Sequence, residues 1–428
     1  MHGFNKWTKV VLVLLITFFI AIWFFVFYKQ DIGKILNEIT LRSAKVEKIQ
    51  GENEWQIVDF SDIAGETKFQ SYLNDKMYPA LEKYRMYGIE IFNDVGFILV
   101  DNEEELRNIV SKKYSDDNDM WNKEWDKIPS LVQAYLFSSR DKGKTFQKVT
   151  LGNGNPQGIY RKDNIFLVLV DHQDKHSTSV YRSLDNGISW KKLFDTQIGD
   201  MLKFKGIVDS QSFIFEWKKW GTAQQGLLIT HNSGKTLEKL PNVFQEAQKK
   251  YRLSIFDKEE MLFISEDGNI TAINIKTNHV RSQKVKLPTN KRIVYIEKNR
   301  ETQEIYFKIR TNKDDGTRLK YNNDQTEIFY LSEEKYIPIP KLKRNFEPFV
   351  SGNYIGGFVR LKGILTHVWT FDRIHWHFEF LPDYLLGPNA NSIGVGYGQI
   401  WMRIDAIYNP NLVKEKGVYL VIGTLKNL

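Results

Sequence analysis

The middle of the chain carries three copies of one short pattern, and their spacing decides the fold. The copies are Ser139-Arg-Asp-Lys-Gly-Lys-Thr-Phe146, Ser183-Leu-Asp-Asn-Gly-Ile-Ser-Trp190 and Thr230-His-Asn-Ser-Gly-Lys-Thr-Leu237. Each reads hydroxyl, any residue, acid or amide, any residue, glycine, any residue, hydroxyl and large apolar residue. The third positions of successive copies lie 44 and then 47 residues apart. A period in this range is typical of the four-stranded blades of a β-propeller.

Each copy lies between two β-like runs, such as Ala134–Phe137 and Gln147–Val149, and is therefore expected to form a hairpin turn. Glycine supplies the positive φ that such a turn needs. The acid or amide accepts hydrogen bonds from nearby backbone N–H groups, and the hydroxyls do the same more weakly. The residues expected to build the turns are Ser139, Asp141, Gly143, Thr145 and Phe146 in the first copy, Ser183, Asp185, Gly187 and Trp190 in the second, and Thr230, Asn232, Gly234 and Thr236 in the third.

The pattern resembles the Asp box, or BNR repeat (S-x-D-x-G-x-T-W), of the sialidase-like β-propeller superfamily. The first two copies match it at almost every position, whereas the third replaces the acid and the aromatic residue. In that family the box is a folding element at the periphery of the blade, away from the central site. The resemblance therefore implies that Asp141 and Asp185 are structural residues, not catalytic or metal-binding ones.

Strand-like runs on both sides of the three copies group into sets of four. Six such sets fit between Tyr87 and Phe380, and Thr370–Trp376 in the sixth resembles a shortened copy of the turn without its glycine. The chain after Ile393 supplies only three runs, and the early run Glu54–Phe60 supplies a fourth. Pairing the two chain ends removes the exposed edges of an open blade. The sequence thus predicts an all-β propeller of seven four-stranded blades, with six or eight as alternatives.

The N-terminus carries a long apolar run. Val10–Tyr28 contains 19 residues, of which only Thr17 is clearly polar. As a helix it would span about 28 Å, enough to cross the hydrocarbon core of a membrane. No small-residue cleavage site follows it, and the chain has no cysteine for lipid attachment. The expected division is a cytoplasmic N-terminus at residues 1–9, a transmembrane anchor at 10–28, a polar stalk at 29–50 and the propeller at 51–428.

Charge bears on location and partners. Lys6 and Lys9 precede the apolar run and favour a cytoplasmic N-terminus. We therefore expect a single-pass protein of a bacterial inner (cytoplasmic) membrane, with the propeller in the periplasm or outside the cell. The net charge of +8 fits an acidic partner or anionic lipid headgroups, although a lysine-rich genome bias explains it more simply. No nucleic-acid-binding signature is present.

Two connections between second and third strands are candidates for partner binding. In the first blade, Asn102–Glu105 resembles a capping box before an amphipathic helix, and Trp121 and Trp125 follow at i, i+4 spacing. In the third blade, Trp217, Lys218, Lys219 and Trp220 interleave aromatic and basic side chains. Both tryptophan pairs are candidate partner-binding residues, because tryptophan is enriched at interface hot spots. Packing against the blades is the alternative role for both pairs.

Signals for catalysis or cofactors are weak. His172, Asp174 and His176 could ligate zinc, but Lys175 interrupts the only such cluster, so a solvated loop is favoured and no cofactor is expected. The early Arg-Ile-Pro segment of sialidases is absent, since the Arg-Ile pairs at Arg292, Arg373 and Arg403 lie late and lack the proline. The chain also lacks a G-x-S-x-G elbow, an H-E-x-x-H helix and a phosphate loop. The sequence therefore does not favour an enzyme.

The sequence favours a membrane-anchored, extracytoplasmic propeller that binds another macromolecule without catalysing a reaction. Anchored bacterial propellers similar to this chain include immunity proteins that neutralise toxins delivered by type VI secretion, which implies a secreted toxin as the protein partner. One alternative is a membrane-complex assembly factor that resembles the Asp-box photosystem assembly propeller. The other is a sialidase-like glycoside hydrolase or a carbohydrate-binding protein.

Overall fold

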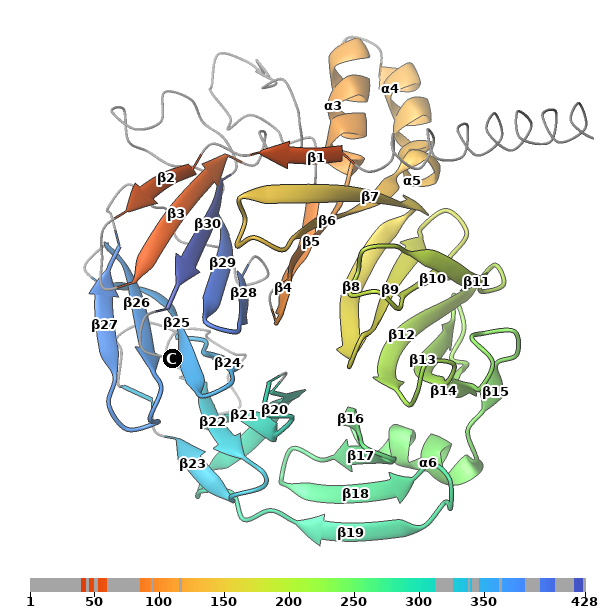
Figure 1. Ribbon diagram of the computed structural model, residues 1–428. Coiled ribbons are helices and arrows are strands. Elements are labelled where there is room, and N and C mark those ends of the chain that lie inside the picture. Colours follow the sequence, from red (N-terminus) through yellow and green to blue (C-terminus); the bar gives the residue numbers. More distant parts are fainter. Residues whose placement is uncertain are drawn as a thin grey trace, which may run out of the picture.

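The repeated turns divide the chain into a ring of seven antiparallel sheets (Figure 1). The computed structural model describes residues 40–43, 46–49, 53–59, 85–93, 95–114, 118–299, 301–311, 326–337, 339–340, 346–361, 364–381, 393–404 and 419–425. In these residues each sheet is a blade of four main strands, with the first strand nearest the centre of the ring. The predicted all-β, seven-bladed propeller is thereby confirmed.

Blades 1 to 6 each take their four main strands from one continuous stretch of sequence. Blade 1 contains β4 (Arg85–Phe92), β5 (Val95–Asp101), β6 (Gln133–Ser139) and β7 (Thr145–Asn153); blade 2 contains β8 (Asn155–Lys162), β9 (Ile165–His172), β10 (Ser177–Ser183) and β11 (Lys191–Asp195); blade 3 contains β12 (Asp200–Ile207), β13 (Phe213–Lys219), β14 (Gln225–Thr230) and β15 (Glu238–Lys239). Blade 4 contains β16 (Leu253–Asp257), β17 (Glu260–Ile264), β18 (Asn269–Asn274) and β19 (Val280–Lys284); blade 5 contains β20 (Lys291–Lys298), β21 (Ile305–Thr311), β22 (Glu327–Tyr330) and β23 (Lys335–Ile337); blade 6 contains β24 (Phe349–Ser351), β25 (Tyr354–Leu361), β26 (Ile364–Thr370) and β27 (His377–Phe380).

Blade 7 joins the two ends of the propeller, as the sequence predicts. Its inner strands are β28 (Ile393–Gly396), β29 (Gln399–Ile404) and β30 (Tyr419–Thr424), and β3 (Glu54–Asp59) pairs antiparallel with β30. Trp55, which is 1% exposed, lies so close to Gly423 that a Cβ there would meet its ring at 2.5 Å. Glycine at position 423 therefore leaves room for Trp55, so that β3 can pair with β30.

The predicted polar stalk, residues 29–50, needs a correction. Its described part forms β1 (Thr40–Ser43), which pairs with β7 of blade 1, and β2 (Val46–Ile49), which pairs with β3 of blade 7. Within the described residues, the propeller sheets thus include Thr40–Ile49, which precede the expected boundary at 51. The predicted cytoplasmic segment 1–9 and membrane anchor 10–28 lie outside the described residues. Among the residues that are described, no helix is both long and apolar enough to cross a membrane.

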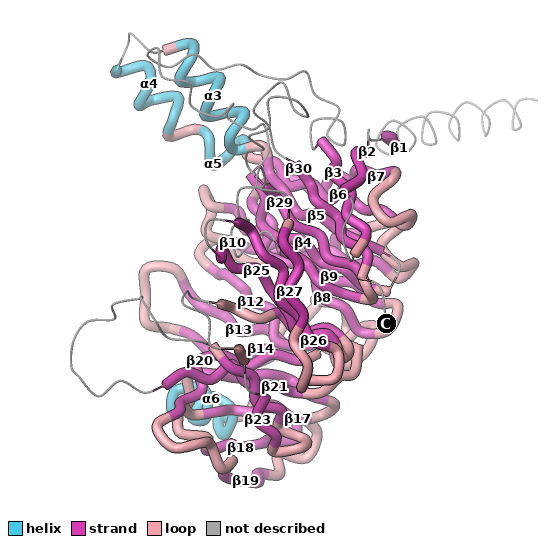
Figure 2. The backbone as a smooth tube through the Cα atoms, turned by 90° about the vertical axis from the view of Figure 1, so that its left-hand side faces the viewer, coloured by secondary structure: helices cyan, strands magenta, loops and turns pink. Residues whose placement is uncertain are grey.

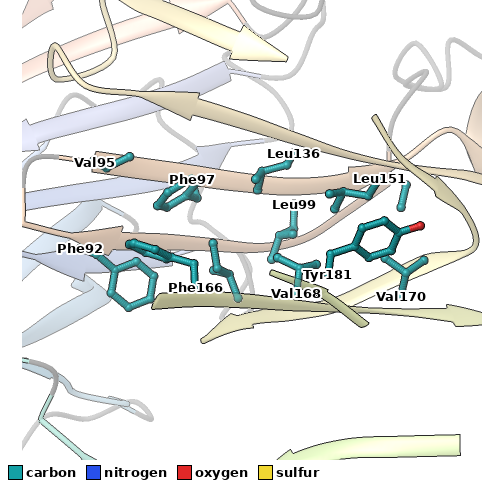
Figure 3. Packing of buried hydrophobic residues seen from close by; sticks show 12 residues of the cluster. Phe92, Val95, Phe97, Leu99, Leu136, Leu151, Phe166, Val168, Val170 and Tyr181 are labelled. Carbon is teal, nitrogen blue, oxygen red and sulfur yellow. The ribbon is translucent and has the colours of Figure 1, made fainter. Parts of the chain in front are cut away.

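The core lies between blades, because each middle strand is covered on both faces by its neighbours. In β9, the six residues from Ile165 to Val170 are all buried, which is why this strand reads as a continuous apolar run and not as an alternating one. Phe166 packs against Phe92 and Phe97 of blade 1, at 5.4 Å between ring centroids in both cases (Figure 3). Burial of these aromatic side chains against the next blade holds the ring together.

Alternation of the strands gives the ring two different faces. The turns between third and fourth strands, which include the repeated motifs, open on one side, here called the box face. The connections between second and third strands, and those between blades, open on the opposite side, here called the loop face. The loop face carries α3 (Glu103–Lys113), α4 (Asn118–Trp125) and α5 (Ile128–Leu131), which project from the disc (Figure 2), and α6 (Asn242–Lys250), between β15 and β16.

Candidate functional site

The repeated motifs form nearly identical hydrogen-bonded turns on the box face. In the second copy, Ser183 Oγ donates to Asp185 Oδ1 at 2.6 Å and accepts from Gly187 N–H at 2.9 Å. Asp185 also accepts from Ser189 N–H at 2.9 Å and from Ser189 Oγ at 2.6 Å. The first copy repeats these bonds through Ser139, Asp141, Gly143 and Thr145. Each carboxylate is thus used to close its own turn.

The third copy keeps the same turn although it lacks the acid. Asn232 Oδ1 accepts from Thr236 N–H at 2.9 Å, and Asn232 Nδ2 donates to Thr236 Oγ1 at 2.9 Å. Thr230 Oγ1 accepts from Gly234 N–H at 2.8 Å. The amide therefore replaces the carboxylate by reversing the direction of one hydrogen bond. The shortened copy in blade 6 makes an equivalent turn, in which Asp372 Oδ1 accepts from His375 N–H at 2.7 Å.

These turns also connect neighbouring blades. Gly187 has a φ of 76°, and a Cβ at this position would meet the Phe97 ring of blade 1 at 2.6 Å. Arg140 of the first copy donates to the backbone oxygen of Asn186 in the second, at 2.8 Å. Burial opposes ionisation of Asp185, but the hydrogen bonds from Ser183 and Ser189 keep the pKa of this carboxyl below its ordinary value. A charged carboxylate that closes its own turn by several hydrogen bonds fits a structural role.

The loop face offers a different kind of surface where blades 2 and 3 meet. The His176 and Trp220 rings stack with centroids 4.1 Å apart and planes 12° from parallel. The backbone N–H of Trp220 donates to the backbone oxygen of Gly199 at 2.7 Å. The backbone N–H of Gly199 in turn donates to the backbone oxygen of Lys175 at 2.9 Å. Both bonds fix the backbone beneath the stacked rings. We call this surface the Trp220 patch; its members are Lys175, His176, Ile198, Lys218, Lys219 and Trp220.

The Trp220 patch combines exposed apolar and basic side chains. Trp220 is 54% exposed and Ile198 is 77% exposed. The side chains of Lys175, Lys218 and Lys219 are exposed as well. An exposed indole can bind an aromatic or aliphatic side chain, and exposed lysines attract carboxylates.

The predicted group Trp217–Trp220 divides between two roles. Trp217 is half-buried and packs against the core cluster between blades 2 and 3, and Lys239 Nζ lies 5.6 Å from the centroid of its ring. Only Trp220 presents its ring to solvent as part of the patch. Trp217 belongs to β13 and lies on the same strand face as the buried Phe213 and Phe215, whereas Trp220 begins the loop that follows the strand.

Trp121 and Trp125 come together inside the helical insert. Their rings stack at 4.5 Å on α4, and Arg107 of α3 places its Cζ 4.4 Å from the centroid of Trp125. Arg107 also pairs with Glu103 in the first turn of α3. The two tryptophans, which are both half-buried, therefore pack α4 against α3, and the exposed apolar side chain of α3 is Ile109.

A buried ionic cluster attaches this insert to blade 1, and the sequence does not predict it. Arg85, at the start of β4, lies 3.1 Å from Asp101 and also pairs with Glu103. Asp101 Oδ1 accepts from Glu103 N–H at 2.9 Å and so caps α3, whereas the expected cap, Asn102, instead accepts from Gln133 N–H at 2.8 Å. Burial raises the pKa of Asp101, against the hydrogen bonds from Glu103 N–H and Arg85. The acidic run at 101–105 was a visible signal, but its distant partner Arg85 was not.

The weak zinc candidate does not assemble. His172 Nε2 lies 2.6 Å from Ser179 Oγ, His176 is stacked on Trp220, and Asp174 is exposed to solvent. Across the part of the chain that the structure describes, no three His, Cys, Asp or Glu side chains are grouped to hold a metal ion. His172 therefore ends β9, and Asp174 and His176 lie in the turn that follows it, where His176 has a stacking role.

Comparison with known proteins finds similarity in fold only. No protein-family model matches the chain, and no curated protein matches it either. The chain is similar to the β-propeller domain of the Trilobed protease from Pyrococcus furiosus (7% identity, TM-score 0.44, 76% of this chain and 90% of that one). It is also similar to YCF48 from Cyanidioschyzon merolae (11%, 0.41, 80% and 99%) and to an oligogalacturonate lyase from Vibrio parahaemolyticus (8%, 0.48, 90% and 98%). Likeness at this level transfers no function, and the chain is defined by its own structure as a seven-bladed β-propeller.

Proposed function

We propose that this protein is a membrane-anchored propeller that binds another protein at the Trp220 patch and catalyses no reaction itself. The observation that carries the proposal is the exposed Trp220 ring, held flat against His176 on a hydrogen-bonded backbone. A rigid, exposed indole loses little conformational entropy when a partner covers it, which is the physical basis of a hot spot.

The partner is a protein with an acidic segment. Lys175, Lys218 and Lys219, which lie next to His176 or close before Trp220 in the sequence, are exposed, and the whole chain carries a net charge of +8. Complementary charge steers association and selects partners more than it adds affinity. Binding should therefore weaken as salt is added, because exposed charges are screened over about 10 Å at 0.1 M.

Further parts of the proposal concern family and location. The hydrogen-bonded turns, with Ser, Asp, Gly and Thr or Ser at fixed positions, support membership of the Asp-box superfamily. The apolar run Val10–Tyr28 supports an anchor in the cytoplasmic membrane, with the propeller on its outer side. A receptor tethered there would meet a secreted toxin on arrival, which is the role of an immunity protein; this last step rests on analogy with anchored propellers.

Single cysteines provide a test of both location and surface, because the natural chain contains none. Lys219→Cys lies in the patch, and Lys284→Cys is a matched exposed lysine on the outer strand of blade 4. In cells with an intact cytoplasmic membrane, an impermeant maleimide should label both variants of the full chain. A thiol-linked photocrosslinker should then capture a discrete acidic protein from position 219 and not from 284.

Two results would contradict the proposal. Labelling that requires cell lysis would place the propeller in the cytoplasm, and equal capture from both positions would remove the patch as the binding surface. The hydrolase alternative makes a separate forecast, since the purified full chain would then cleave a glycoside without any protein partner. Such turnover would refute the claim that the protein has no catalytic activity.

A further inference from the structure

A pocket opens between blades 3 and 4, next to the Trp220 patch but made of other residues. Its volume is about 320 Å³, within the usual size of small-ligand sites. Strands β12 to β14, helix α6 and the segment leading into β16 all contribute to its lining. The charged lining residues are Lys205, Glu216, Lys249, Lys250 and Arg252.

Lys205 is the deepest of these cations. Its side chain is 14% exposed, and its Nζ lies 2.8 Å from Glu216 and 3.1 Å from Ser254 Oγ of blade 4. The residue occupies a β-bulge, where the register of β12 against β13 shifts between Phe204 and Gly206. A bulge re-aims the side chain that it carries, and here it brings a lysine to the seam between two blades.

Helix α6 holds two further cations at the rim. Gln245 fixes the helix to β14, because its Oε1 accepts from Leu227 N–H at 2.9 Å and its Nε2 donates to the Leu227 oxygen at 3.0 Å. Lys249 and Lys250, in the last turn, are exposed, and among the described residues neither has a carboxylate partner. Arg252 is 81% exposed and pairs with Glu266 at 3.2 Å.

The charge of the pocket is thus unbalanced. Among the described lining residues are four cations and one carboxylate, Glu216. Lys205 pairs with Glu216 and Arg252 pairs with Glu266, so Lys249 and Lys250 carry the excess positive charge of the pocket. Gln225, Gln248 and Ser254 add neutral hydrogen-bonding groups.

We propose that this pocket binds a small oxyanion ligand, one that carries a phosphate or a carboxylate group. The lysines at the rim supply the charge-assisted hydrogen bonds that such groups prefer, and the side chains from both blades close around the ligand. This site does not depend on a protein partner at the Trp220 patch.

The test is titration of the purified full chain at constant ionic strength, by calorimetry, with inorganic phosphate in one series and citrate in another. Saturable binding of either anion is expected, and the tighter of the two identifies the preferred group. The double variant Lys249→Gln, Lys250→Gln should weaken that binding about tenfold or more, because hydrogen bonds to charged groups are the strong ones. The control, Lys284→Gln with Lys286→Gln, removes the same charge from exposed positions of blade 4 and should leave affinity unchanged.

A third variant changes the affinity in the opposite direction. Glu216→Gln removes the carboxylate that faces the anion and should tighten binding, which a purely structural role of Glu216 would not do. The proposal is overturned if neither anion binds saturably to the natural chain, if both lysine double variants lose affinity equally, or if Glu216→Gln weakens binding.

Discussion

At the scale of single residues, one side chain organises each turn of the box face. Asp185 accepts hydrogen bonds from Ser183, from Ser189 N–H and from Ser189 Oγ, and Asn232 does the equivalent work without a charge. The comparison shows that the turn needs acceptors in the right direction and does not need a negative charge. These residues therefore bear on stability, whereas we propose that Trp220 serves recognition.

Replacing Asp185 tests that division. Asp185→Ala should lower the free energy of unfolding by about 1 kcal/mol, because water can reach Ser189 and partly replaces the lost acceptors. Asp185→Asn should lose less stability, because Asn232 forms the same turn with an amide. Asp174→Ala, at an exposed position, should leave the free energy of unfolding unchanged. Thermal unfolding of the three variants measures this order. A folded Asp185→Ala protein that no longer binds its partner would show that the turn is part of the site.

At the scale of elements, strand β3 closes the ring through a buried polar contact. Asn53, just before it, donates to Glu379 of blade 6 through its backbone N–H at 3.1 Å and its side-chain amide at 2.8 Å. His367 is fully buried beside them, with Tyr354 Oη 2.9 Å from its Nε2 and the Trp55 ring 5.5 Å away. Burial lowers the pKa of His367, although Glu379 opposes this shift.

The closure should therefore be acid-sensitive. Because the folded pKa of His367 lies below its unfolded value of about 6.5, the unfolded state takes up a proton that the folded state refuses. The contribution of neutral, buried His367 to the free energy of unfolding is complete above about pH 6.5. It falls as the pH drops below about 6.5, by at most about 1.4 kcal/mol per pH unit. Unfolding between pH 7.5 and 5.5 should show a shallower dependence in His367→Gln and an unchanged one in the exposed control His279→Gln. Parallel curves for the natural chain and His367→Gln would contradict this assignment.

What the sequence could predict follows from the range of the interactions. The turn around Asp185 is local, and the closing role of Glu54–Phe60 follows from counting strands, so both were predicted correctly. The His176–Trp220 stack joins two blades, and the Arg85–Asp101 pair joins a strand start to a strand end. Such contacts depend on how blades and strands are aligned, which periodicity alone does not determine. For the same reason the sequence predicts a polar stalk where β1 and β2 in fact pair with β7 and β3.

At the scale of the whole molecule, the two faces of the ring differ in chemistry. The box face consists of short turns that tie blade to blade, as Arg140 does with Asn186. The loop face carries the helical insert, the Trp220 patch and the pocket between blades 3 and 4, and these last two adjoin where Lys218 pairs with Gln225 across the strands. Under the proposed function, stability and recognition belong to opposite sides, so a variant on one side should leave the other intact.

The central claim, that a protein binds at the Trp220 patch, is tested most directly by one affinity measurement. The partner captured from position 219 is titrated against the full natural chain, Trp220→Ala and Phe380→Ala, the last of which removes an aromatic ring that is 63% exposed on blade 6. We predict that Trp220→Ala weakens binding by about 2 kcal/mol or more, roughly thirtyfold in Kd, while Phe380→Ala binds as the natural chain does. Equal affinities for all three proteins would contradict the account.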